Sequence, residues 1–319
     1  MTKAFEESLS LFKDKISDCI KSKKSISITT HIDCDGLTSG SIIAKALIRE
    51  GAKCTIRTSK EFSKNVVESF KTDSRDFHII TDLGGGFGKD LNQTLGDNWI
   101  ILDHHQISEE EKDNQNIINA WKYEIDGGTE ISAGGMAYFA ATALNEKNSD
   151  LSEIAIVSAL GDRQDQGDKK SFTGKNFEIA NTAKELGLVD IDLDLLLVGR
   201  ETRPLAEALA FTSQPFIEGL TWNKETCLSV LNSAGIQLKE EGRWRVPAEL
   251  NEDEKKAVIE SITKFSSDKN TSEIMSELIG YTYTFPKEDK RSFLRDGREY
   301  STMLNSCGRI NRSGVGMAI

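Results

Sequence analysis

Long apolar runs are missing from this sequence, and proline and cysteine are scarce. No stretch approaches the roughly 18 apolar residues that a membrane-spanning helix requires, and only 4 prolines occur in 319 residues. The 5 cysteines are scattered and form no CxxC pair: Cys19, Cys34, Cys54, Cys227 and Cys307. Scattered thiols of odd number are typical of free cysteines in a reducing compartment. We therefore expect a cytoplasmic protein without a membrane segment.

Several functional motifs are also missing. No G-x-x-x-x-G-K-[ST] occurs, and no serine or cysteine lies in a nucleophile elbow, which argues against nucleotide-driven motors and acyl hydrolases. The glycine-rich segment at 84–88 is followed by Lys89 where a dinucleotide-binding G-x-G-x-x-G needs its last glycine. We interpret this segment as a turn. No internal repeat of solenoid period is present.

Positive charge is in short supply, since the net charge is −11. Broad, non-specific adhesion to nucleic acid needs clustered lysine and arginine. A nucleic-acid substrate must therefore be held locally, with metal ions supplying part of the positive charge.

The pattern of hydrophobic residues predicts an α/β fold with a parallel, doubly wound sheet. After an amphipathic helix at 3–20, short β-branched runs near residues 25–30, 54, 79 and 100 alternate with helix-forming stretches. The first of these helices is expected to begin at Gly40 and to end at Gly51. We expect further helices at 132–144, with Ser132 as the N-cap, and at 151–161, with Gly161 as the C-cap. Polar helical stretches at 173–187, 223–232 and 251–264 precede a strand at 281–288.

Acidic and histidine residues follow four apolar runs. The four segments are HIDCDG (31–36), TDLG (81–84), LDHH (102–105) and ALGD (159–162). Residues at the carboxyl ends of parallel strands converge on one crevice, which would bring five carboxylates and three imidazoles together. Because neighbouring carboxylates repel and raise each other's pKa values, such a group calls for divalent cations.

The donor types indicate which metal and which chemistry. Carboxylates with one or two imidazoles and no thiolate suit Mn²⁺ or Mg²⁺ better than structural zinc. Two such ions sharing a carboxylate perform in-line phosphoryl displacement. We expect Asp33 and Asp35 to lie on an extended segment, so that both face the metals while Cys34 faces the interior. Of the adjacent His104 and His105, one then binds metal and the other addresses the substrate.

Each of these residues also has a purely structural interpretation. An aspartate directly after a strand is often the N-cap of the next helix, which applies to Asp82 and Asp162. His31 by itself is compatible with a buried structural histidine. The joint occurrence of the four segments favours the metal site, because only His78 of the 4 histidines lies outside them.

The four segments, in this order, resemble motifs I to IV of the DHH phosphoesterases. The resemblance implies one set of metal ligands: Asp33, Asp35, Asp82, His104 and Asp162. It implies that His105 lies near the scissile phosphate and that Asp103 orients the histidine pair. His31 stands two residues before the first metal aspartate rather than four, as in some branches of the family, so its metal role stays open.

The segment LRDGREYSTMLNSCGR (294–309) is similar to the start of the DHH-associated C-terminal domain of archaeal RecJ-like nucleases, among them the nuclease that partners the GINS replication complex. In that domain, basic and amide groups grip substrate phosphates. The matching residues here are Arg298, Asn305 and Arg309, with Gly308 allowing close approach of the backbone.

The resemblance implies three parts of the chain. Residues 1–168 would form a DHH phosphoesterase domain with the metal site, 169–280 a helical linker with an inserted helical module, and 281–319 a partial C-terminal substrate-binding domain. Relatives of this type continue further, and their glycine-rich GGGH-like motif is absent here. We therefore expect either a truncated product or a partner that supplies the missing surface.

Three functions are compatible with these features. The leading hypothesis is a RecJ-like exonuclease that cleaves single-stranded DNA or RNA with two Mn²⁺ or Mg²⁺ ions. A phosphodiesterase acting on short oligonucleotides or cyclic dinucleotides is the second. The third is a Cdc45-like replication scaffold bound to a GINS-type complex, which predicts eroded metal motifs, whereas all four motifs are intact here.

Overall fold

The computed structural model describes residues 2–266 and 271–319, which form two compact units. The first unit comprises residues 2–166, 172–187 and 301–319, and the second comprises residues 167–171 and 188–300. The last 19 residues of the chain pack within the first unit. The three functional parts expected from the sequence stay a prediction.

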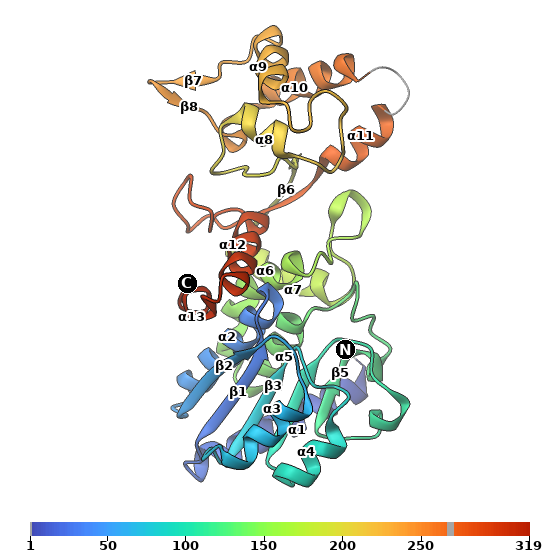
Figure 1. Ribbon diagram of the computed structural model, residues 1–319, viewed down its shortest axis with the longest axis vertical. Helices are drawn as coiled ribbons and strands as arrows, with labels where there is room; N and C mark the ends of the chain where they lie inside the picture. Colours follow the sequence, from blue (N-terminus) through green and yellow to red (C-terminus); the bar gives the residue numbers. More distant parts are fainter. Residues whose placement is uncertain (1, 267–270) are drawn as a thin grey trace. The chain divides into compact units, whose positions relative to one another are not determined.

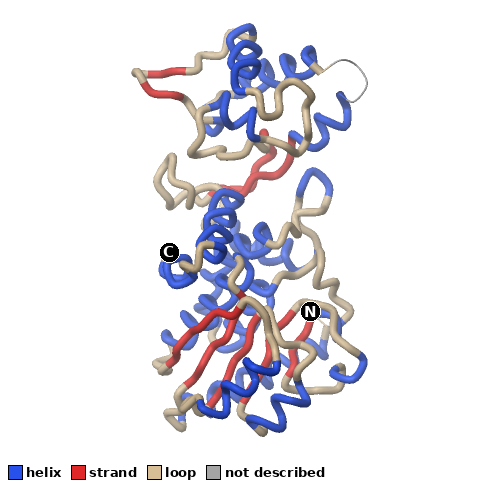
Figure 2. Tube along the Cα trace, in the orientation of Figure 1, coloured by secondary structure: helices blue, strands red, loops and turns tan. Residues whose placement is uncertain are grey.

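A five-stranded parallel sheet forms the centre of the first unit, and its strands are red in Figure 2. The strand order is β2-β1-β3-β4-β5. The strands are β1 (Ile26–His31), β2 (Cys54–Ser59), β3 (Phe77–Thr81), β4 (Trp99–Asp103) and β5 (Ile117–Asn119). The chain winds from β1 outward to β2 and then crosses back to β3. The topological switch point, where α/β proteins bind ligands, therefore lies between the carboxyl ends of β1 and β3.

Helices cover both faces of this sheet (Figure 1). The α-helices are α1 (Lys3–Lys21), α2 (Cys34–Arg49), α3 (Lys64–Ser69), α4 (Gly88–Leu95), α5 (Ala133–Leu144), α6 (Ser152–Gly161), α7 (Gly174–Glu185) and α13 (Ser313–Ala318). Side chains of α3 and α4 pack with those of β3, β4 and β5 in one apolar cluster. Helix α2 contacts both α5 and α6. The predicted α/β fold with a parallel, doubly wound sheet is confirmed.

The second unit has a core of its own. Its helices α8 (Leu205–Phe211), α9 (Lys224–Ser233), α10 (Glu252–Phe265) and α11 (Thr271–Leu278) supply most of a buried apolar cluster. Strand β6 (Asp190–Leu195) pairs with β9 (Ile279–Thr284) in antiparallel orientation, and β7 (Lys239–Glu240) pairs with β8 (Arg243–Trp244). The helical character expected for this part of the chain is confirmed.

Two kinds of segment complete the described chain. Helix α12 (Gly297–Arg309) begins in the second unit, and its residues from Ser301 onward belong to the first. Six short 3₁₀ helices are η1 (Phe70–Thr72), η2 (Glu109–Glu111), η3 (Ala120–Tyr123), η4 (Glu146–Leu151), η5 (Asp168–Lys170) and η6 (Pro247–Glu249). None of the helices among residues 2–266 and 271–319 is long and apolar enough to cross a membrane.

Two helix ends differ from the prediction. Helix α2 begins at Cys34 rather than at Gly40, because the Asp33 carboxylate caps it by accepting a hydrogen bond from the Gly36 amide at 3.0 Å. Helix α6 ends at Gly161, and its C-cap is Asp162, one residue after the predicted cap. The left-handed residue that follows is Arg163, at φ 57°, rather than a glycine. The N-cap at Ser132 is confirmed by its hydrogen bond from the Gly135 amide.

Candidate metal centre

The switch point of the sheet brings together the four predicted motifs. Asp33 and Asp35 do not alternate along an extended segment, so that expectation was wrong. Asp33 is the N-cap of α2, and Asp35 lies in its first turn, where it is buried. Cys34 is buried between them, as expected. A helix N-terminus favours negative charge, so this turn offers a better position for two carboxylates than a strand end.

One group of ligand atoms surrounds His104. Its Nε2 lies 3.2 Å from Oδ2 of Asp35 and 3.3 Å from Oδ1 of Asp82, and Asp162 approaches its Nδ1 at 3.8 Å. Its Nδ1 lies 2.6 Å from the carbonyl oxygen of Gly127 and must donate a proton to it. This bond leaves Nε2 as the nitrogen that faces the carboxylates, which is the arrangement of a metal-ligating histidine.

A second group surrounds His31. Its Nδ1 lies 2.9 Å from Oδ2 of Asp33 and 3.7 Å from Oδ2 of Asp82. Its Nε2 lies 3.2 Å from the carbonyl oxygen of Lys60, which accepts the Nε2 proton and leaves Nδ1 directed at the carboxylates. The geometry thus groups His31 with the candidate ligands, where the sequence had left its role open.

Asp82 joins the two groups. Its Oδ1 faces His104, its Oδ2 faces His31, and the side chain is only 2% exposed. Its backbone has φ 62°, the left-handed region, directly after β3. Side chains other than glycine are uncommon there, and such strain is often found at functional sites. Burial and the nearby Asp35 carboxylate raise the pKa of Asp82 well above its ordinary value.

Asp35 is held by a set of hydrogen-bond donors. Its carboxylate accepts bonds from the amides of Ala133 and Gly134 at 2.9 and 3.1 Å, at the N-terminus of α5, and from the hydroxyl of Ser158. Burial alone would raise the pKa of Asp35, but the hydrogen bonds from His104, Ser158 and the α5 amides lower it overall. Asp35 is therefore a charged carboxylate that is oriented before any ligand arrives.

The charges of this cluster need a cation. Burial lowers the pKa of His104, but its hydrogen bonds with Asp35 and Asp82 raise it well above the ordinary value. Burial, followed by the Asp35 charge, raises the pKa of Asp162 to about 6. Protons thus compensate the carboxylates where no metal is bound. Oxygen and imidazole donors without a thiolate ligand fit Mn²⁺ or Mg²⁺.

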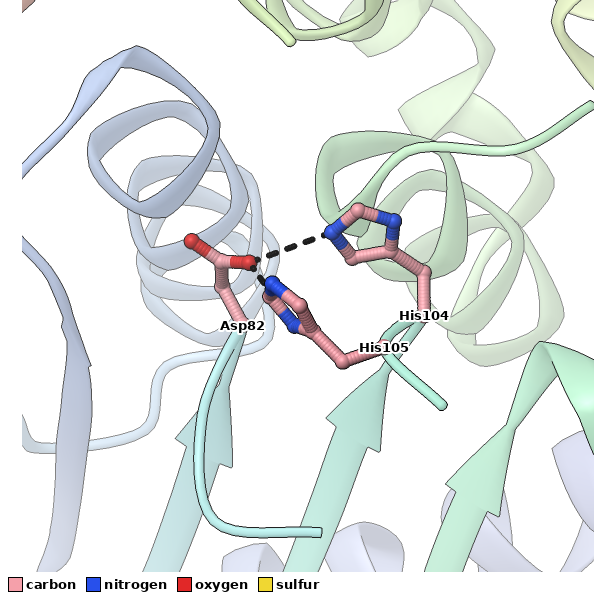
Figure 3. A group of neighbouring side chains, drawn as sticks. All are labelled: Asp82, His104 and His105. Atoms are coloured by element: carbon pink, nitrogen blue, oxygen red, sulfur yellow. Dashed lines mark ion pairs between the residues drawn. The ribbon is translucent and has the colours of Figure 1, made fainter. Parts of the chain in front are cut away.

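His105 is oriented differently from His104 (Figure 3). Its Nδ1 lies 2.8 Å from Oδ1 of Asp103, and 3.7 Å from Oδ1 of Asp82. The same Asp103 oxygen accepts the amides of His104 and His105 at 2.8 and 3.2 Å. The hydrogen bond to Asp103 raises the pKa of His105 to about 9. Nδ1 is committed to Asp103, and the His105 side chain is 60% exposed.

Gln164 was not identified from the sequence. This fully buried side chain donates from Nε2 to Oδ2 of Asp162 at 2.8 Å and to the carbonyl oxygen of Gly127 at 2.8 Å, the oxygen that also holds His104. Asn176 donates to its Oε1 at 2.6 Å. The one available signal was an amide two residues after a candidate ligand, which is too common in proteins to have singled out Gln164.

The predicted substrate-binding residues fall into two groups. Arg298 lies in the second unit, where it donates to the carbonyl oxygen of Tyr281 at 2.9 Å and lies over the Tyr283 ring. Asn305, Gly308 and Arg309 lie in the part of α12 that belongs to the first unit, and Arg309 is exposed. Their role in substrate binding stays a prediction.

Comparison with known proteins places this centre in a family. Residues 25–161 match the model of the DHH family, N-terminal domain, and residues 197–279 match the DHH-CID domain model. Residues 25–161 therefore form a DHH-family domain. The DHH match contains every candidate ligand except Asp162, which lies one residue beyond it, and the DHH-CID match lies within the second unit.

Individual relatives differ in how much of the chain they match. An uncharacterized protein of Methanocaldococcus jannaschii is 28% identical over 320 residues, which cover 96% of this chain and 67% of that protein. The crystal structure of Cdc45 from Entamoeba histolytica superposes with a TM-score of 0.66 and 16% identity, covering 99% of this chain and 67% of that one, which shows a shared fold. RecJ from Thermus thermophilus, in complex with Mn²⁺, matches with a TM-score of 0.45 and 15% identity over 86% of this chain and 37% of its own.

Proposed function

We propose that this DHH protein is a metal-dependent phosphodiester hydrolase that acts on single-stranded DNA or RNA as a RecJ-like exonuclease. One observation carries the proposal: Asp82 directs one carboxylate oxygen at each of two groups of histidine and aspartate ligands. A carboxylate placed in this way would be a ligand to both members of a pair of divalent cations.

Each group of residues has a role in this proposal. Asp35, Asp82, His104 and Asp162 would hold one cation, and His31, Asp33 and Asp82 the other. Two bound cations would supply an activated water and positive charge for in-line displacement at phosphorus. Asp103 holds the His105 ring, and Nε2 of His105 would donate a proton to the departing oxygen. Arg309 would bind a substrate phosphate.

The intact ligand set favours catalysis over a purely scaffolding role. A scaffold requires no buried carboxylate cluster, and burying one without compensation is costly. Binding to a GINS-type replication complex, as a second activity of the same chain, is a proposal that comes from the resemblance of residues 294–309.

The test is cleavage of end-labelled single-stranded DNA, single-stranded RNA and dinucleotides with Mn²⁺. Dinucleotides are included because the net charge of −11 disfavours a long polyanion. We expect degradation of at least one polymer, and a loss of about a hundred-fold or more in kcat/KM for Asp82→Asn. Asp18→Asn, which changes an exposed aspartate of α1, is the control. Cleavage of dinucleotides alone would replace the nuclease with the small-substrate phosphodiesterase, and activity without metal would overturn both.

A further inference from the structure

Helix α12 contacts the turn that carries the first two aspartates. The amide of Cys34, which lies between Asp33 and Asp35, donates a hydrogen bond to Oδ1 of Asn305 at 2.9 Å. The two residues are 271 positions apart in the sequence, and both lie in the first unit. Because a backbone amide can only donate, the oxygen of the Asn305 side chain is the atom that faces the turn.

This bond satisfies a specific donor of helix α2. The first amides of a helix have no partner within the helix. The Asp33 side chain takes the amide of Gly36, and Asn305 takes the amide of Cys34. Two of the free donors of this turn are thus satisfied by side chains, one from the turn itself and one from α12.

Gly308 packs against the same turn one helical turn later. A Cβ atom at Gly308 would overlap the carbonyl oxygen of Ile32. The absence of a side chain therefore lets α12 approach the backbone directly before Asp33. Asn305 and Gly308 lie three residues apart and so share one face of the helix.

We propose that Asn305 and Gly308 are positioning residues of the metal centre, which hold the segment Ile32–Asp35 so that Asp33 and Asp35 face their ligand groups. This role rests on the proposed metal site. It differs from the substrate role predicted for Asn305, because the side-chain oxygen is engaged by the protein's own backbone. Residues that orient metal ligands typically affect metal affinity about ten- to a hundred-fold.

The first experiment measures Mn²⁺ affinity by calorimetric titration of full-length variants. We expect Asn305→Ala to weaken Mn²⁺ binding by about ten-fold or more. Asn305→Asp retains an oxygen acceptor for the Cys34 amide and should bind Mn²⁺ within a few-fold of the original chain. Ser306→Ala is the matched control, because Ser306 is exposed and its hydroxyl donates to the Thr302 carbonyl of its own helix. Its affinity should not change.

The second experiment follows amide hydrogen exchange of residues 32–37 without metal. In Asn305→Ala the amides of this segment should exchange faster than in the original chain. In Ser306→Ala their exchange rates should not change. Gly308→Ala should act in the same direction, by displacing α12 from Ile32. Unchanged exchange together with unchanged Mn²⁺ affinity in Asn305→Ala overturns the proposal.

A kinetic measurement separates positioning from substrate binding. If Asn305 positions the metal ligands, activity of Asn305→Ala on single-stranded DNA recovers as Mn²⁺ is raised, and KM changes little. A raised KM that Mn²⁺ does not restore assigns Asn305 to the substrate instead and overturns the proposal. If the original chain binds no Mn²⁺, the proposed function fails, and the exchange data alone then decide whether Asn305 holds the turn.

Discussion

At the scale of single residues, burying the Asp82 carboxylate lowers stability when no metal is bound, although the same carboxylate is a candidate metal ligand. A carboxyl group whose pKa is raised on folding contributes stability that is fully present below its unfolded pKa and is lost as pH rises through the folded pKa. The pKa of Asp82 is raised well above the ordinary value by burial and by Asp35. Without metal, Asp82 therefore destabilises the fold increasingly as the pH rises.

Asp82→Asn should remove this pH-dependent loss of stability. The amide has similar size and does not titrate, so without metal we expect the variant to melt several degrees above the original chain at pH 8 and to lose this advantage towards pH 4. With saturating Mn²⁺ the order should invert, because only the original chain binds the metal. Thermal melts between pH 4 and 8, with chelator and with Mn²⁺, make the measurement. A pH-independent difference would contradict the raised pKa.

The hydrogen bond between His105 and Asp103 leads us to expect a pH dependence of the reaction. The hydrogen bond to Asp103 raises the pKa of His105 to about 9. If protonated His105 donates to the leaving oxygen, kcat falls as pH rises through about 9. Asp103→Asn keeps an oxygen that can accept the amides of His104 and His105, but it removes the charge. Its alkaline limb should move towards the ordinary histidine pKa, near about 6.5. The check is a pH–rate profile from 6 to 10; an unmoved limb would remove His105 from proton transfer.

Arg309 tests the proposed contact with substrate phosphate. A guanidinium can form two parallel charge-assisted hydrogen bonds to phosphate, whereas a lysine ammonium acts as a single point charge. Arg309→Lys should therefore lower kcat/KM by about ten- to a hundred-fold, which corresponds to roughly 1.5–3 kcal/mol. Mn²⁺ affinity should stay unchanged, because a guanidinium carries only N–H donors and cannot be a metal ligand. Normal kinetics in Arg309→Lys would exclude Arg309 from the site.

At the scale of elements, the metal centre depends on how α5 and α6 pack. Gly134 lies in the first turn of α5, where its amide bonds to Asp35 and to the Ser158 hydroxyl of α6. A Cβ atom at Gly134 would overlap the Ser158 side chain. This overlap could be relieved only if α5 and α6 moved apart.

Gly134→Ala should therefore destabilise the protein by about 1–3 kcal/mol, the usual cost of overpacking a core. The matched substitution is Gly314→Ala in α13, where an added Cβ meets nothing within 4 Å. It should be neutral or slightly stabilising, because alanine is the better helix former. Denaturant unfolding of both variants makes the comparison. Equal effects in the two would show that α5 and α6 separate at little cost.

The sequence predicted the elements of the first unit, and which candidate ligands lie close together, better than it predicted the local geometry of those residues. Alternating apolar runs and helical stretches are local signals, so the sheet and the convergence of Asp82 and His104 followed from topology. The start of α2 was misplaced because Asp33 serves both as helix cap and as candidate ligand. The contact of Gln164 with Gly127 and that of Asn305 with Cys34 join residues far apart in the chain, and no pattern in a single sequence encodes such contacts.

At the scale of the whole molecule, the candidate metal ligands are confined to one unit, although both units have a buried apolar cluster. Every candidate metal ligand lies in the first unit, whereas the second unit has its own buried cluster that includes Leu209, Leu231 and Ile262. A ligand that binds only one folded unit stabilises that unit by mass action. Metal binding should therefore separate the unfolding of the two units.

We expect differential scanning calorimetry to resolve two transitions once Mn²⁺ is present at about a hundred times its dissociation constant. Binding at that concentration stabilises the first unit by about 2.7 kcal/mol, which raises its melting temperature on the order of 5–10 °C for a unit of this size. The melting temperature of the second unit should not change. Asp82→Asn should show no Mn²⁺-dependent separation. If a single transition moves as Mn²⁺ is added, the two units unfold as one cooperative body, and the stabilisation from the metal centre extends across the whole chain.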